Sequence, residues 1–273
     1  MAQRDTGTPD LLAELEGGVL TLTLNRPQAR NAMSDDMNQA LAHQLAEAEL
    51  DTDVRCIVLT GAGQGFCAGG DVKGMNERNT AGGAGASIDH AIHRQRVNQR
   101  GTAGKLFKMP KPTLAALPGA AAGAGLSLAL ACDLRIMASS AFLTTAFAKV
   151  GLAGDYGGTY FLTQLVGSAK ARELYFLSER VSAEEALRLG LANWVVPPEE
   201  LAARTREIAA RLAAGPAVCI RYMKENLNRA MAGDPDECLD MEATHHVHSA
   251  QTADHREAAK AFVEKREPVF SGR

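Results

Sequence analysis

The chain alternates between short apolar runs of strand length and longer amphipathic stretches of helical length. Over residues 12–24 apolar and polar positions alternate around Gly17-Gly18, a pattern that predicts a β-hairpin. A helix is expected to begin after Ser34, where two aspartates precede an apolar stripe with helical spacing. Further short apolar runs predict strands at 55–60, 113–117, 134–138, 141–143 and 194–196.

Helical patterns fill the spaces between these strands and take over completely near the C-terminus. Ahead of Pro197 we expect helices over 88–107, 126–131, 156–165, 169–177 and 183–190. Beyond it we expect only helices, over 199–214, 216–231, 235–252 and 254–266. We therefore divide the chain into a core of residues 1–196 and a helical region of residues 197–273.

The stretch from Pro112 to Asp133 organises the core. It predicts a buried strand, a break at Pro118-Gly119, a glycine turn at 123–125 and then a buried helix. The N-terminus of such a helix presents unpaired N–H groups and favours negative charge. Its Ala and Gly lining contains no Lys or Arg, which suits a transient oxyanion better than a bound phosphate.

Another glycine-rich loop, residues 61–71, lies earlier in the chain and also follows a predicted strand. The two turns are able to supply two N–H donors to one oxygen. Phe66 stands where a G-x-G-x-x-G dinucleotide fingerprint needs its last glycine, and a Walker A loop needs a Gly-Lys-Ser/Thr that is absent. A nucleotide-phosphate site is therefore not favoured at this loop.

Two other interpretations of the central stretch are less consistent with its residues. Residues 114–132 carry no charge and approach the length of a membrane span, but Pro118 and three glycines interrupt them. Residues 125–129 nearly match the G-x-S-x-G nucleophile elbow, but the second glycine is missing and Ser127 falls inside the helix.

Composition is that of an ordinary globular protein. The chain has 273 residues, a formal net charge of −3 and 46% hydrophobic residues, with no basic excess that would indicate nucleic-acid binding. Its five cysteines are scattered and form no C-x-x-C motif, which argues against a disulfide framework or a zinc-thiolate site. The N-terminus has no apolar segment typical of a secretion signal, so we expect a cytoplasmic protein.

Asp155 is the main candidate for acid–base chemistry. It lies among small and apolar residues, where burial raises a carboxyl pKa and suits it to act as a base. The alternative is a structural role as the N-cap of the helix that follows. His90 and His93, one turn apart on a predicted helix, either face a substrate or form a polar helix surface. The histidines of 245–248 do not share one helix face, so no metal site is expected there.

Several motifs together resemble the crotonase, or enoyl-CoA hydratase/isomerase, superfamily. They are spread over nearly the whole chain, at 25–27, 31–32, 66–73, 111–116, 119–125, 131–133, 157–159, 186–191 and 262–266. The resemblance implies an α/β fold, a crotonase-like spiral of ββα units with a C-terminal helical trimerisation region. It also implies assembly as a homotrimer or a dimer of trimers.

The resemblance further implies an acyl-CoA thioester substrate, with coenzyme A as part of the substrate and no tightly bound cofactor. By position, the backbone N–H groups of Ala68 and Ala124 form the oxyanion hole for the thioester oxygen. Lys73 corresponds to a contact to the nucleotide portion of CoA, and Lys265 to one that reaches a neighbouring subunit's CoA. The other residues implied to line the acyl-CoA site are Gly69, Gly70, Asp71 and Gly123.

The family's hydratases use two glutamates, and this chain has Ser127 and Phe147 at those positions. Neither side chain can replace a carboxylate in hydration. Asp155 precedes Gly-Gly-Thr, where several isomerases of the superfamily carry an acid, so our leading hypothesis is an enoyl-CoA isomerase with Asp155 as the base. The alternatives are a hydratase, lyase or hydrolase acting on acyl-CoA, with His90 or His93 assisting, and a non-catalytic acyl-CoA-binding paralogue.

Overall fold

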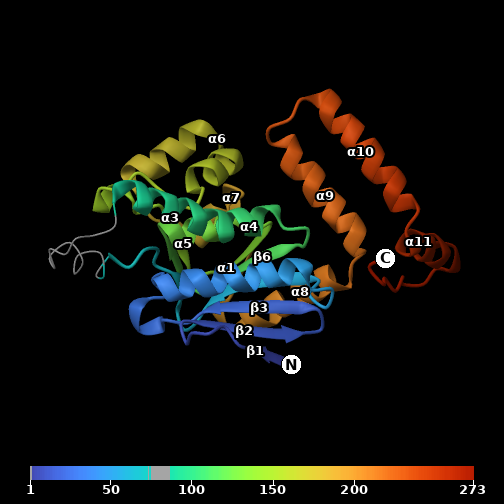
Figure 1. Ribbon diagram of the computed structural model, residues 1–273, viewed down its shortest axis with the longest axis horizontal. Helices are drawn as coiled ribbons and strands as arrows, with labels where there is room; N and C mark the ends of the chain where they lie inside the picture. The colour runs from blue at the N-terminus through green and yellow to red at the C-terminus, as the bar shows by residue number, and fades with distance from the viewer. Residues whose placement is uncertain (1, 73, 75–86) are drawn as a thin grey trace.

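The structure is a computed structural model that describes residues 2–72, 74 and 87–273. These residues form two β-sheets with helices packed on them and a group of helices that extends away (Figure 1). The strands are β1 (Ala2–Arg4), β2 (Leu11–Glu16), β3 (Val19–Leu24), β4 (Cys56–Gly61), β5 (Gly65–Cys67), β6 (Thr113–Leu117), β7 (Ala120–Ala122), β8 (Leu134–Ala138), β9 (Phe142–Thr144), β10 (Val181–Ser182) and β11 (Trp194–Val196). The α-helices are α1 (Asp35–Leu50), α3 (Ile88–Gly101), α4 (Ala103–Lys108), α5 (Ala124–Ala131), α6 (Gly158–Leu177), α7 (Ala183–Arg188), α8 (Leu201–Ala214), α9 (Ala217–Ala230), α10 (Pro235–Ala250) and α11 (Ala253–Glu264).

The larger sheet has the strand order β1-β2-β3-β4-β6-β8-β11, and the smaller one β10-β9-β7-β5. In the larger sheet β1, β2 and β3 are antiparallel, and each strand from β3 to β11 pairs in parallel with the next. All five residues of β6 are buried, because a parallel strand at the centre of a sheet is covered on both faces. The expected hairpin is confirmed as β2 and β3, and Ser34 caps α1 through the N–H of Met37.

The chain from β4 to α6 repeats one unit. β4, β6 and β8 lie in the larger sheet, and the strand that follows each of them lies in the smaller sheet. Each pair of strands is followed by helices: α3 and α4, then α5, then α6. This order is the expected spiral of ββα units. It brings the chain directly after β5 next to the chain directly after β7, since β5 and β7 are paired strands.

The prediction of a single helix over 88–107 is wrong, because the helix is interrupted at one residue. The structure has α3 and α4 with a break at Thr102, whose φ and ψ are −113° and −88°. The buried Thr102 hydroxyl donates to the Asn98 carbonyl at 2.7 Å, and Gly101 precedes it. Threonine and glycine both weaken a helix interior, so the chain turns here.

The helices beyond residue 197 pack in two different ways. α8 lies against β3, β4, β6 and β8, with Leu201, Ile208 and Ala209 buried. α9, α10 and α11 stand away from the sheets at the other side of the molecule from α3 and α6 (Figure 1). Lys224 of α9 connects them to the core, because its buried ammonium group donates to Leu106 O, Lys111 O and Asp133 Oδ2 at 2.8–3.0 Å.

Candidate active site

The first glycine-rich loop, residues 61–71, is held by the segment that precedes α1. The Asn31 amide is completely buried and donates to the carbonyls of Ala62 and Gly65 at 3.0 and 2.8 Å. The Arg26 guanidinium donates to Asp71 Oδ2 at 3.2 Å from two of its nitrogens. Asp71 Oδ1 accepts from the N–H of Gly74. The Asp71 carboxylate therefore fixes the shape of this loop.

The second loop begins α5 and lies directly against the first. Gly123 has φ 52° and ψ −127°, a conformation open to glycine alone, and Ala124 is the first residue of the helix. A β-carbon at Gly69 would lie 2.8 Å from Ala122 O and 3.2 Å from Ala124 N. One at Gly125 would lie 2.4 Å from Cys67 O. Glycines at 69 and 125 thus let the two turns approach to backbone contact.

The two candidate oxyanion-hole amides differ in their partners. Ala124 is at the first position of α5, where an N–H has no acceptor within the helix. The Ala68 N–H donates to the carbonyl oxygen of Arg30 at 3.0 Å. Arg30 and Asn31 both have left-handed backbones, with φ 53° and 55°, so this carbonyl is presented by a tight turn. An incoming oxygen would have to share or replace the Arg30 carbonyl at Ala68.

Asp155 lies on a short loop before α6 whose backbone is held from two sides. Gly154, Tyr156 and Gly157 all have positive φ, at 109°, 49° and 76°. The N–H of Tyr156 donates to Gln99 Oε1 of α3 at 2.7 Å, and its hydroxyl donates to Asn38 Oδ1 of α1 at 3.3 Å. α6 itself has Gly157 as its N-cap and no side-chain cap, so Asp155 does not cap it.

The Asp155 carboxyl is in an apolar environment. Its Oδ1 atom is buried and has no hydrogen-bond partner among the residues that the structure describes. Burial raises the pKa of Asp155 to about 6. Burial also raises the pKa of the Cys67 thiol to about 12, and the negative charge of Asp155 adds to that rise. Cys67 immediately precedes Ala68, so the carboxylate lies close to the first glycine loop.

The two positions that the family resemblance assigns to the hydratase glutamates, 127 and 147, carry no carboxylate. Ser127 is buried in the first turn of α5, and its hydroxyl donates to the Gly123 carbonyl at 3.3 Å. The Phe147 ring is buried and stacks on Tyr175, with ring centres 5.8 Å apart and planes at 12°. Its Cε1 atom lies 3.7 Å from where a β-carbon of Gly123 would be. Ser127 and Phe147 thus both lie beside the start of α5.

The remaining predicted residues lie elsewhere or outside the described part of the chain. Lys73 is not among the described residues. His90 and His93 are exposed on α3. Lys265 is exposed at the C-terminal end of α11, far across the molecule from α3 and α6 (Figure 1). The structure therefore brings together residues 68–71, 123–124 and 155, and it places Lys265 apart from them.

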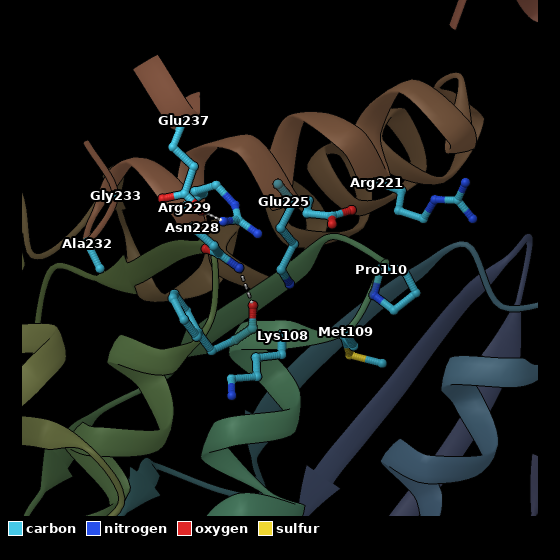
Figure 2. Close-up of a pocket in the computed structure, with 12 residues that line it drawn as sticks. Lys108, Met109, Pro110, Arg221, Glu225, Asn228, Arg229, Ala232, Gly233 and Glu237 are labelled. Atoms are coloured by element: carbon cyan, nitrogen blue, oxygen red, sulfur yellow. Dashed lines mark hydrogen bonds and ion pairs between the residues drawn. The ribbon is translucent and has the colours of Figure 1, made fainter. Parts of the chain in front are cut away.

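A cavity of about 630 Å³ lies at the seam between the end of α4 and helices α9 and α10. Figure 2 shows Asn228 reaching across it, where the side-chain amide donates to the Phe107 carbonyl at 2.9 Å. Arg229 and Glu237 form an ion pair on its outer side. None of the residues that line this cavity belongs to the glycine loops or to the Asp155 loop. The cavity therefore belongs to the junction between the core and the helical region, and not to the candidate active site.

Within residues 2–72, 74 and 87–273, no group of three or more His, Cys, Asp or Glu side chains is arranged to hold a metal ion. No helix in the described chain has the length and apolar character needed to cross a membrane.

Sequence and structure comparisons identify the family. The sequence profile of the enoyl-CoA hydratase/isomerase family matches residues 14–273. The chain is 40% identical to 1,2-epoxyphenylacetyl-CoA isomerase of Escherichia coli (strain K12) over 263 residues, which are 96% of this chain and 98% of the relative. It is 36% identical to the short-chain-enoyl-CoA hydratase of Clostridium acetobutylicum over 258 residues, 94% of this chain and 95% of the relative.

A solved structure has the same fold over the same length. The crystal structure of enoyl-CoA hydratase from Bacillus anthracis superposes with a TM-score of 0.88 at 33% sequence identity, covering 97% of this chain and 100% of the other. These matches cover nearly the whole chain. They agree with the ββα spiral and with the two adjacent glycine turns. The chain belongs to the enoyl-CoA hydratase/isomerase family of acyl-CoA enzymes.

Proposed function

We propose that this protein is an enoyl-CoA isomerase that moves a double bond along the acyl chain, with Asp155 as its base. One observation carries the proposal. A buried carboxyl with a raised pKa lies beside the two glycine turns, and Ser127 and Phe147 stand at the two positions that the family resemblance assigns to the glutamates of a hydratase. The relatives do not decide between the activities, because one is named as an isomerase and another as a hydratase.

The proposed reaction is a 1,3-proton shift through an enolate. The Asp155 carboxylate removes a proton from the α-carbon of a 3-enoyl thioester, and the electron pair of that C–H bond delocalises onto the thioester oxygen. The protonated Asp155 then returns the proton to the γ-carbon, which leaves a 2-enoyl thioester and the starting carboxylate. The cycle consumes no water and needs no second acid.

In this proposal the enolate oxygen accepts hydrogen bonds from the N–H groups of Ala124 and Ala68. Each donor to such an oxyanion contributes about 3 kcal/mol to the stability of the transition state. The Ala68 donor is shared with Arg30 O, which holds it at 3.0 Å in the free chain. Residues 68–71, Lys73 and Gly123 are proposed to line the acyl-CoA site, and coenzyme A enters as part of the substrate.

We also propose that the protein works as a homotrimer or a dimer of trimers. Lys265 ends α11, and α11 lies on the other side of the molecule from α6, which directly follows the Asp155 loop (Figure 1). We therefore propose that Lys265 contacts the CoA of a neighbouring copy. Large apolar side chains are exposed on the helices that stand off the core, which suits burial between copies. They are Met223, Leu227, Leu239, Val247, Phe262 and Val263.

The function is tested by comparing two substrates. We expect 3-enoyl-CoA to be converted to 2-enoyl-CoA at least about 100-fold faster than 2-enoyl-CoA is hydrated, because no second carboxylate orients water. Thioester absorbance and chromatography of the products measure both rates. The double variant Ser127→Glu, Phe147→Glu tests whether restoring the pair increases hydration. Rapid hydration by the unmodified protein would contradict the proposal, and acyl-CoA binding without any turnover would identify a non-catalytic paralogue.

The pH dependence of isomerisation should report Asp155. As the base, Asp155 must be deprotonated in the free enzyme, so kcat/KM should rise with pH and level off above an apparent pKa of about 6. An unburied aspartate would place this limb about two pH units lower. Initial rates between pH 4.5 and 8, with stability checked at each pH, measure the limb. A profile that is flat from pH 5 upward would exclude Asp155 as the base.

A further inference from the structure

Tyr175, which none of the sequence motifs includes, faces the loop that carries Asp155. It lies near the C-terminal end of α6, and its ring is stacked against Phe147 in nearly parallel planes. A β-carbon at Gly154 would lie 3.0 Å from its Cε1 and 3.4 Å from its hydroxyl oxygen. One at Gly158 would lie 2.6 Å from that oxygen. The hydroxyl therefore lies against the residues on both sides of Asp155.

Glycine at position 158 keeps the space in front of this hydroxyl open. The same hypothetical β-carbon would also lie 2.3 Å from the Ser127 hydroxyl oxygen of α5. Tyr175 and Ser127 thus approach Gly158 together, one from α6 and one from the helix that begins at Ala124. The Tyr175 hydroxyl is therefore placed between the Asp155 loop and the first turn of α5.

The other polar groups around Asp155 already have partners. The Tyr156 hydroxyl donates to Asn38, the Gln99 amide oxygen accepts from the Tyr156 N–H, and the Ser127 hydroxyl donates to Gly123. The Cys67 thiol donates to the Asn31 carbonyl at 3.0 Å. Asp155 Oδ1 has no partner within the described chain, and the Tyr175 hydroxyl makes no hydrogen bond there either.

We propose that Tyr175 is a positioning residue for Asp155, whose hydroxyl donates a hydrogen bond to the carboxylate when substrate is bound and holds it as a base toward the acyl chain. This inference rests on the proposed function. The stacked Phe147 fixes the direction of the Tyr175 ring, so Phe147 has a role in the site even though it carries no acid–base group. A hydratase glutamate at that position would lack this stack.

The electrostatics agree with a hydroxyl that donates without transferring its proton. Burial raises the pKa of Tyr175 above its ordinary value, and the negative charge of Asp155 adds to the rise. The groups that face Asp155 within the described residues are the Cys67 thiol from β5, the Tyr156 side chain from the same loop and Tyr175 from α6. α3 contributes the uncharged Gln99, and α5 contributes the uncharged Ser127.

Tyr175→Phe tests the inference, because it removes only the oxygen and keeps the ring stack. We expect kcat for isomerisation to fall about tenfold, the equivalent of one hydrogen bond, with KM changed less than about twofold. The acidic limb of the pH profile of kcat, which reports the substrate complex, should move to higher pH, because the carboxylate there loses a donor that favours its charged form. The matched control is Tyr160→Phe, in the part of α6 that precedes the break at Gly167, where its partly exposed ring contacts Phe107 and Phe161. It should leave rate and profile unchanged.

The outcomes separate this inference from the proposed function. If Tyr175→Phe matches the unmodified protein in kcat and in the position of the limb, Tyr175 does not position Asp155. If its kcat falls but the limb stays in place, the effect is structural and the inference is again wrong. Asp155→Asn tests the base independently, and activity retained in that variant would overturn the proposed function. If Asp155 is the base and Tyr175 positions it, Tyr175→Phe should cause no further loss of kcat in an Asp155→Asn background.

Discussion

Replacing Asp155 by Asn is expected to lower kcat for double-bond migration by about 10³-fold, because the amide cannot accept the α-proton. The shape of the side chain is preserved and the glycine loops are untouched. Binding of a non-reactive acyl-CoA, measured by calorimetry, should therefore remain within about threefold of its original affinity. Rates are compared on one 3-enoyl-CoA substrate at about pH 7.5, where the carboxyl of the unmodified protein is ionised. Asp53→Asn, an exposed carboxylate on the α1–β4 turn, is the matched control.

The same variant should be more stable at neutral pH. The native pKa of Asp155, about 6, lies above its ordinary value of 3.8. The folded chain therefore binds more protons than the unfolded chain between these two pH values, and the stability contributed by this group declines as pH rises through that window. An asparagine side chain does not titrate in this range and lacks this decline, so the melting temperature of the variant should exceed that of the unmodified protein at pH 7 and approach it near pH 4. A variant that loses activity and also loses stability at pH 7 would indicate damage to the fold.

Gly69→Ala should damage the contact between the two glycine turns. The added methyl group would meet Ala122 O at 2.8 Å and Ala124 N at 3.2 Å, at a residue whose φ is +90°. The turns must separate, which would move apart the Ala68 and Ala124 N–H groups that we propose bind the thioester oxygen. We expect kcat/KM to fall about 10²–10³-fold, the effect of losing one oxyanion donor. Backbone strain should lower the free energy of unfolding by about 1–3 kcal/mol.

Gly65→Ala is the matched control for this prediction, because it lies on the same loop and a β-carbon there would meet nothing within 4 Å. Its activity and denaturation midpoint should stay close to those of the unmodified protein. Equal losses in both variants would mean that the loop tolerates no side chain anywhere. An active Gly69→Ala protein would show that the contact between the turns does not matter for turnover.

Much of the architecture could be predicted because its signals are local. The hairpin follows from alternation around Gly17-Gly18, and Ser34 caps α1 as its residue type predicts. The helices after Pro197 begin and end within a few residues of their expected limits, because glycine and proline mark the hinges. The glycine-rich segments were recognisable because each follows an apolar run that forms a buried strand, β4 or β6. The short strands β5 and β7, which directly precede the two turns, were not predicted. Asp155 was recognisable because it is an acid among small and apolar residues.

Other features depend on contacts between distant segments and leave no such signal. Gln99 supports the Asp155 loop from α3, bonding to a residue 57 positions further along the chain, and a glutamine in a polar helix gives no hint of that role. Tyr175 is similar, since an aromatic residue near a helix end usually fills the core. The packing of α8 on the sheet depends on which face the sheet leaves uncovered. The break at Thr102 was missed because the apolar pattern continues through it while the hydroxyl binds Asn98.

In the proposed mechanism, the Arg30 carbonyl would give the protein a means of discriminating between reactant and transition state. A peptide carbonyl is a better acceptor than the oxygen of a neutral thioester, so an arriving substrate gains little at the Ala68 amide. Once the α-proton leaves, the same oxygen becomes anionic and competes successfully for that N–H. The interaction therefore strengthens during the chemical step instead of at docking, and this timing accelerates turnover without tightening the hold on substrate or product.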